Sequence, residues 1–216
     1  MIRAVVFDMD GVLIDSEPLW REVREEFAQS QGKLWTQDDQ IATMGRSSVD
    51  WVRVMVERMQ LGLSADEVVR EIVDRLIDKY AVNLPVRRGA LAAVRLAASR
   101  YRIGLASGSP SALIDWVLRR TGLAGEFEVV MYGDDMTHGK PHPEIYEKAL
   151  QRLGVKPAEA VGIEDSSSGI RSLHAAGMGI IAAPSPGFPL APDVIALADY
   201  VINSLEDFDI DLLPAG

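Results

Sequence analysis

The sequence predicts an α/β protein that has a doubly wound parallel sheet and an inserted all-α domain. Three features lead to this prediction: short runs that are apolar at every position, stretches of helical period between these runs, and a long, purely helical stretch after the first run. Strands that are buried on both faces are apolar at every position, which is typical of a parallel sheet covered by helices.

The strongest strand candidates are three apolar runs, each followed by a small or acidic residue. They are residues 4–7, 103–106 and 160–163, followed by Asp8, Ser107 and Glu164. Residues 127–132 and 179–183 are weaker candidates of the same kind.

Helical patterns separate these strands. One apolar stripe consists of Leu113, Ile114, Val117 and Leu118, and another of Ile145, Tyr146, Ala149, Leu150 and Leu153. Strands and helices therefore alternate from about residue 86 onward, which is the pattern of a doubly wound (Rossmann-like) fold.

The segment 15–85 breaks this alternation, because it contains only helical patterns. Its apolar positions form three groups: Leu19, Val23 and Phe27, then Val52, Val56 and Met59, then Val69, Ile72, Val73, Leu76, Ile77 and Tyr80. We expect an α/β core made of residues 1–14 and 86–216, with residues 15–85 forming a helical cap domain.

The composition is that of an ordinary globular protein of 216 residues, with 48% hydrophobic and 25% charged residues. The net charge of −10 makes binding to nucleic acid or to an anionic membrane unfavourable. The absence of cysteine excludes disulfides, thiolate nucleophiles and cysteine-bound zinc. No signal peptide opens the sequence, so the expected location is the cytoplasm; a monomer is expected.

Ligands of an open parallel sheet bind at the carboxyl ends of its strands, so the residues that follow the strands are the candidate site residues. Asp8 and Asp10 follow the first strand two residues apart, and Gly11 permits a sharp exit of the chain. Taken alone, this pair of carboxylates could equally cap a turn.

Ser107, Gly108 and Ser109 follow the second strand and precede a helix. A hydroxyl group, flexible backbone N–H groups and a helix N-terminus together suit the binding of an anion. The alternative is a helix N-cap with Pro110 in the first turn.

Lys140 stands just before a helix, bracketed by the chain-stiffening residues Pro141 and Pro143. We interpret it as a functional lysine, because a solvated lysine needs no such rigid bracket. We expect His142 to pack or to cap rather than to bind a metal, since no second histidine stands at ligand spacing.

Glu164 and Asp165 follow the third strand, and Ser167 or Ser168 is the expected N-cap of the next helix. Two adjacent acids after a buried strand are costly unless they are paired. An oxygen-rich cluster without cysteine or paired histidine suits Mg²⁺ rather than zinc. Together, the four segments predict a site of phosphoryl transfer.

The four segments resemble those of the haloacid dehalogenase (HAD) superfamily of phosphohydrolases. The matching stretches read VVFDMDGVLIDSE at 5–17, LASGS at 105–109, GKPHP at 139–143 and GIEDS at 162–166. The resemblance is strongest to the group of β-phosphoglucomutase-like proteins and sugar-phosphate phosphatases that carry a helical cap.

The resemblance implies a role for each of these residues. Asp8 would attack phosphorus to form an aspartyl phosphate, and Asp10 would act as the general acid and then as the general base. Mg²⁺ would be held by Asp8, by the backbone carbonyl of Asp10 and by Asp165, with Glu164 acting directly or through water. Ser107 would bind phosphoryl oxygens, and Lys140 would offset the negative charge.

Several reactions occur on this fold, and the residues favour a phosphatase acting on a small phosphorylated metabolite, such as a sugar or sugar-alcohol phosphate. A β-phosphoglucomutase is the main alternative, but it carries a histidine where Trp20 stands here. Asp10, Glu164 and Asp165 argue against a dehalogenase. A catalytically idle binding protein is the least favoured alternative, since no motif residue is missing.

The cap is expected to select the substrate. Arg46 could reach a substrate hydroxyl or carboxylate, and Glu17 and Trp20 could line the entrance of the site. Equally, Arg46 could be a solvated turn residue and Trp20 a residue of the cap interior.

Overall fold

The computed structural model describes residues 1–43, 48–185, 187 and 189–210. Six parallel strands form one sheet in the order β3-β2-β1-β4-β5-β6, which confirms the doubly wound α/β fold. The strands are β1 (Ala4–Phe7), β2 (Arg102–Ala106), β3 (Val129–Met131), β4 (Ala160–Glu164), β5 (Gly179–Ala182) and β6 (Tyr200–Val201). All five expected strands are present, and β6 is a short addition at the edge.

The central strand β1 shows why its sequence does not alternate. Val5 and Phe7 belong to one buried cluster, whereas Ala4 and Val6 belong to another. Because successive side chains of a strand point to opposite faces, both faces of the sheet are buried.

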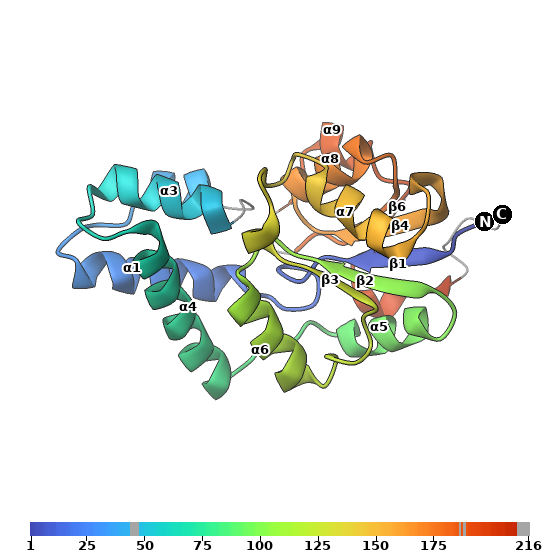
Figure 1. Cartoon of the computed structure of the whole chain (residues 1–216), viewed down its shortest axis with the longest axis horizontal. Helices are drawn as coiled ribbons and strands as arrows, with labels where there is room; N and C mark the ends of the chain where they lie inside the picture. The colour runs from blue at the N-terminus through green and yellow to red at the C-terminus, as the bar shows by residue number, and fades with distance from the viewer. Residues whose placement is uncertain (44–47, 186, 188, 211–216) are drawn as a thin grey trace.

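Helices cover each face (Figure 1). The cluster of Val5 and Phe7 includes residues of α5 (Ala90–Ala98) and α6 (Ser111–Thr121), so these helices cover one face. The cluster of Ala4 and Val6 includes residues of α7 (Glu144–Leu153), α8 (Ser167–Ala175) and α9 (Pro192–Ile195). The short 3-10 helices η1 (Gly133–Asp135), η2 (Pro157–Glu159) and η3 (Leu205–Asp207) lie in the connections.

Among the described residues between β1 and α5, four helices group together beyond one end of the sheet (Figure 1). They are α1 (Glu17–Ser30), α2 (Gln37–Thr43), α3 (Ser48–Met59) and α4 (Ala65–Val82). The sequence pattern predicts α1, α3 and α4 but not α2, whose residues form no apolar stripe. Among the described residues, no helix is both long enough and apolar enough to cross a membrane.

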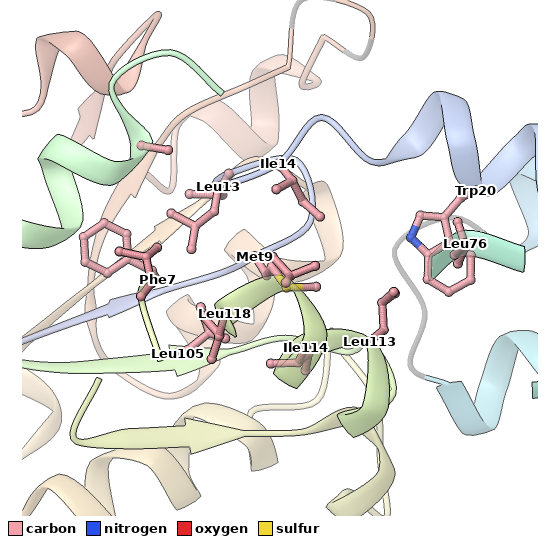
Figure 2. Packing of buried hydrophobic residues seen from close by; sticks show 14 of the residues in the cluster. Phe7, Met9, Leu13, Ile14, Trp20, Leu76, Leu105, Leu113, Ile114 and Leu118 are labelled. Carbon is pink, nitrogen blue, oxygen red and sulfur yellow. The ribbon is translucent and has the colours of Figure 1, made fainter. Parts of the chain in front are cut away.

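Two adjacent chain segments connect these helices to the sheet. Ile14 and Val86 form an isolated antiparallel bridge, and the backbone N–H of Asp15 donates to the carbonyl of Pro85 at 2.8 Å. One buried cluster continues across this connection: Figure 2 shows Phe7, Met9 and Leu105 near the sheet, and Trp20 and Leu76 toward the helices.

The expected N-cap of α8 is wrong by one or two residues. Ser166, rather than Ser167 or Ser168, precedes the helix, and its hydroxyl oxygen accepts a hydrogen bond from the backbone N–H of Gly169 at 3.1 Å. Three consecutive serines give the sequence no means of choosing among them, because each has the side chain of a good N-cap.

Candidate active site

The candidate site lies at the carboxyl ends of the central strands. Phe7 of β1 is paired with Leu105 of β2 and with Ile163 of β4, so the residues that follow these strands emerge side by side. A cavity of about 600 Å³ opens there. Its lining includes the predicted residues Asp8, Asp10, Ser107, Gly108, Ser109, Lys140 and Asp165.

Lys140 connects two of the buried carboxylates. Its Nζ lies 2.8 Å from Oδ1 of Asp8, 2.6 Å from Oε1 of Glu164 and 3.1 Å from the carbonyl oxygen of Ala106. Burial alone would lower the pKa of Lys140, but the charges of Asp8 and Glu164 outweigh it and hold this pKa well above its ordinary value. The ammonium group therefore stays charged inside the site.

Even with Lys140 present, the site carries excess negative charge. Burial, opposed by Lys140 and aided by Glu164 and Asp10, raises the pKa of Asp8 to about 8. Burial, together with the charges of Glu164 and Asp8, also raises the pKa of Asp165 well above its ordinary value. Carboxylates that repel one another in this way form a fitting site for a divalent cation.

Gly11 leaves room for Asp165. It has a φ of +77°, and a Cβ atom at this position would lie 1.9 Å from Oδ2 of Asp165. A side chain at residue 11 would therefore displace that carboxylate. The sequence predicts the sharp exit of the chain at Gly11, and the structure adds the close approach of Asp165.

Asp10 accepts four hydrogen bonds from side chains. Its Oδ1 accepts from the hydroxyl of Ser16 at 2.7 Å and from the indole N–H of Trp20 at 3.2 Å. Its Oδ2 accepts from the hydroxyls of Ser107 at 3.0 Å and Ser109 at 2.7 Å. The carboxylate thus joins the start of helix α1 to the loop that follows β2.

The loop of Ser107, Gly108 and Ser109 precedes α6. The N-cap of this helix is Pro110, which has no side chain able to accept a hydrogen bond from the first turn. Ser107 is fully buried, and its hydroxyl accepts from the backbone N–H of Ser109 at 3.1 Å while donating to Asp10. Both hydroxyls face the same carboxylate, and the loop lines the cavity.

Glu164 is fully buried and does not line the cavity. Its two oxygens accept five hydrogen bonds, from Lys140 Nζ, Tyr146 Oη, the backbone N–H groups of Asp165 and Ser166, and the Ser166 hydroxyl. One of its oxygens nevertheless falls in a cluster with Asp8 and Asp165 whose potential ligand atoms all lie within 4.8 Å of one another.

Of the predicted cap residues, Glu17 and Trp20 line the cavity, and Arg46 lies outside the described residues. Trp20 is also buried, and its ring packs edge-on against Trp51 at 5.6 Å between centroids. Both interpretations of Trp20 therefore hold, because it borders the cavity and packs in the interior.

Arg24 and Trp51 line the same cavity, and neither is among the residues predicted from the sequence. A signal for Arg24 exists in the sequence, since it follows Trp20 by four residues and Glu17 by seven. These spacings place all three side chains on one face of a helix.

The structure confirms the capping role expected of His142 but places a second histidine beside it, although none was expected at ligand spacing. The rings of His138 and His142 stack at 4.5 Å between centroids, beside Glu144. Nδ1 of His142 accepts the backbone N–H of Glu144 at 3.2 Å, which is the expected capping role. Stacked rings do not point their nitrogen lone pairs at one common ion, and Lys148 already pairs with Glu144 at 2.6 Å. This geometry does not favour a metal site at these three residues.

The family model and the similar proteins agree on one family. Residues 2–177 match the haloacid dehalogenase-like hydrolase family. The chain is 36% identical over 180 residues to the phosphorylated carbohydrates phosphatase of Thermotoga maritima, and the alignment covers 82% of each protein. It is 32% identical over 209 residues to hexitol phosphatase B of Escherichia coli (strain K12), which covers 95% of this chain and 94% of the relative.

The solved structure of β-phosphoglucomutase from Clostridium difficile has a TM-score of 0.81 at 24% identity, and the match covers 98% of this chain and 95% of that one. At this identity the likeness shows a shared fold alone.

Proposed function

The chain belongs to the haloacid dehalogenase-like hydrolase family, and from this membership we propose that it is a Mg²⁺-dependent phosphatase of sugar or sugar-alcohol phosphates. The observation that carries the proposal is the meeting of Asp8, Asp10, Ser107, Lys140 and Asp165 at one cavity. This set of groups suits phosphoryl transfer to a carboxylate.

Asp8 is the nucleophile. Lys140 holds Oδ1 of Asp8, so we assign the attack on phosphorus to Oδ2. The attack forms an aspartyl phosphate and breaks the bond between phosphorus and the ester oxygen, which leaves with a proton supplied by Asp10. Asp10 then takes a proton from the water that attacks the intermediate, and inorganic phosphate is released.

Ser107 and Ser109 supply donors for the phosphoryl oxygens. In the structure both hydroxyls donate to Asp10. A bound phosphoryl group would compete for these donors, and this would free Oδ2 of Asp10 for proton transfer. Lys140 offsets the charge of Asp8 and of the phosphoryl group throughout.

The acidic cluster fits a magnesium ion, because its donors are all oxygens and its charge is incompletely balanced. Asp8, Asp165 and the backbone carbonyl of Asp10 would hold the ion. When bound, Mg²⁺ would neutralise charge that develops on the phosphoryl oxygens. We assign Glu164 mainly to positioning Lys140, since its oxygens already accept five hydrogen bonds.

We further propose that residues 15–85 form a cap domain over a core of residues 1–14 and 86–216. The cavity supports this division, because residues of α1, α2 and α3 line it opposite the strand ends. The cytoplasmic location and the monomeric state stay predictions from the sequence.

A β-phosphoglucomutase is the alternative that shares this fold. The mutase resemblance calls for a histidine in the first cap helix, and Trp20 occupies that position here. The three histidines of the chain are His138, His142 and His174, all outside residues 15–85. Without an imidazole at this position, hydrolysis is favoured over return of the phosphate to a sugar.

The test is phosphate release from p-nitrophenyl phosphate and from a panel of sugar and hexitol phosphates, with Mg²⁺ and with EDTA. We expect Mg²⁺-dependent release that the Asp8→Asn variant lacks, whereas the exposed control Asp38→Asn retains it. Release at the Asp8→Asn level for every compound would refute the phosphatase. Efficient conversion of glucose 1-phosphate to glucose 6-phosphate would establish the mutase instead.

A further inference from the structure

Arg24 is a buried cation that faces the catalytic cavity. It lies on α1, is only 3% exposed, and lines the cavity together with Asp8 and Lys140. Its guanidinium carbon lies 4.8 Å from the ring centroid of Trp20 and 5.6 Å from that of Trp51. The two indoles therefore fix the position of the guanidinium group.

Two donors of this guanidinium have no hydrogen-bond acceptor in the part of the chain that the structure describes. They are Nε and Nη1 of Arg24. Burial lowers the pKa of Arg24 to about 10, with Glu17 and then Asp10 opposing the shift, so the group is still charged at neutral pH. A buried charged donor without an acceptor is unfavourable, so a ligand that accepts from it would bind favourably.

Glu17 provides an acceptor on the same wall of the cavity. Gln40 donates to Oε1 of Glu17 at 2.5 Å, and Gln40 in turn accepts from the indole N–H of Trp35 at 2.8 Å. This chain of hydrogen bonds fixes the carboxylate of Glu17. Burial raises the pKa of Glu17, and the charge of Arg24 opposes the rise.

The wall thus presents a donor and an acceptor of opposite charge beside two aromatic rings. A hydroxyl group accepts from a guanidinium and donates to a carboxylate, so it satisfies both partners at once. A second phosphate or a carboxylate would satisfy Arg24, but Glu17 and Asp10 would repel it.

We propose that Arg24, together with Glu17, binds hydroxyl groups on the carbon chain of the substrate and thereby selects a polyhydroxylated, uncharged body. This inference rests on the proposed phosphatase function and names the part of the substrate that the strand-end residues do not contact. A substrate without these hydroxyls would leave both buried partners unpaired, which is a strong basis for rejecting it.

The test compares kcat/KM for a hexitol 6-phosphate, for n-hexyl phosphate and for fructose 1,6-bisphosphate, in wild type and in Arg24→Met. Methionine keeps an unbranched side chain and removes the donors. In Arg24→Met, we expect the kcat/KM for the hexitol phosphate, divided by the kcat/KM for hexyl phosphate, to fall about 10- to 100-fold. This is the effect of losing a hydrogen bond to a charged group. Arg21→Met is the matched control, since Arg21 is on the same helix but exposed and paired with Glu25.

The thermal midpoint separates recognition from packing. Removing two buried donors without acceptors should offset the loss of the guanidinium's contacts with the two indoles, so the Tm of Arg24→Met should stay close to that of wild type. A lower Tm with an equal loss for all three substrates would show a structural role and overturn the proposal. Should Arg24→Met not fold, Glu17→Gln gives the same ratio measurement.

The remaining outcomes are also decisive. The greatest loss for the bisphosphate would show that Arg24 binds a second anion, and an unchanged ratio would show that it binds no substrate; either result overturns the proposal. If wild type hydrolyses hexyl phosphate better than the hexitol phosphate, this inference fails but the phosphatase stands. If it hydrolyses none of the compounds above the Asp8→Asn level, the phosphatase itself fails.

Discussion

The indole Nε1 of Trp20 donates a hydrogen bond to Oδ1 of Asp10 across 3.2 Å. Trp20 belongs to helix α1, and Asp10 follows strand β1, so this bond joins the helical segment directly to the proposed acid and base. Ser16 strengthens the same connection through its hydroxyl, 2.7 Å from Oδ1. The position of helix α1 and the position of the Asp10 carboxyl group are therefore coupled.

Substituting Trp20→Phe should lower kcat about tenfold, because it keeps an aromatic ring but removes one of the hydrogen bonds that position the Asp10 side chain. Steady-state kinetics with p-nitrophenyl phosphate measure the effect. Trp116→Phe, the same change outside the cavity lining, is the control. A kcat equal to that of wild type in Trp20→Phe would show that the indole N–H does not assist Asp10.

Lys140→Met should abolish most activity, by about 1000-fold, because the charge that offsets Asp8 is lost. It should also reduce the free energy of unfolding by about 3–5 kcal/mol, since a buried ion pair loses one partner. Urea unfolding and phosphate release measure the two effects. Lys33→Met, at an exposed lysine, controls for loss of one positive charge. A stable and active Lys140→Met would contradict the assigned role.

Gly11→Ala should reduce activity by at least about 100-fold, because the new Cβ would lie 1.9 Å from Oδ2 of Asp165. Gly32→Ala is a matched control: Gly32 has a φ of +67°, and no atom lies within 4 Å of its added Cβ. Each variant should lose about 1–2 kcal/mol of stability from backbone strain. Activity measured as a function of Mg²⁺ concentration should distinguish the two variants. Equal kinetics in Gly11→Ala and Gly32→Ala would contradict the predicted displacement of Asp165.

Glu144 should make the free energy of unfolding of the chain depend on pH. Its carboxylate accepts from Lys148 and from the backbone N–H groups of Thr137 and His138, and these bonds lower its pKa to about 2 from an ordinary 4.5. A lowered folded-state pKa contributes stability that is complete above the unfolded value and is lost as the pH falls through the folded value. The free energy of unfolding of wild type should therefore exceed that of Glu144→Gln by a constant amount above about pH 5, and the difference should vanish toward pH 2.

Unfolding free energies of wild type and Glu144→Gln, measured by urea titration at intervals between pH 2 and pH 7, test this expectation. Glu147→Gln controls for loss of one carboxylate on the same helix. A difference between wild type and Glu144→Gln that does not change with pH would contradict the assigned hydrogen bonds.

The sheet and the strand-end residues could be predicted because their signals are local. An apolar run such as Ala4–Phe7 reports burial on both faces, and the residue that follows it falls at the ligand-binding edge of a parallel sheet. Helix α2 escaped prediction because its short sequence, QDDQIAT, has no apolar residues at helical spacing. Its Gln40 is nevertheless buried, and its side chain is hydrogen-bonded to those of Glu17 and Trp35.

The roles of Arg24 and Trp20 depend on contacts between distant parts of the chain. The indole of Trp51, which lies beside Arg24, comes from helix α3, and Asp10, which binds Trp20, comes from the end of β1. Neither relation has a periodicity that a sequence displays. For the same reason, the sequence predicts that Glu164 lies at the strand-end site but not that it is buried and binds Lys140 and Tyr146.

The bridge between Ile14 and Val86 means that the helical segment departs from and rejoins the sheet at neighbouring points. A segment whose two ends are adjacent can change in length or sequence without altering the spacing of the strands it interrupts. Different helical segments could therefore be grafted between Ile14 and Val86, and the phosphate-handling residues should keep their places where the graft retains Ser16 and Trp20, which bind Asp10. Such chimeras would allow substrate preference to be altered separately from the chemical step.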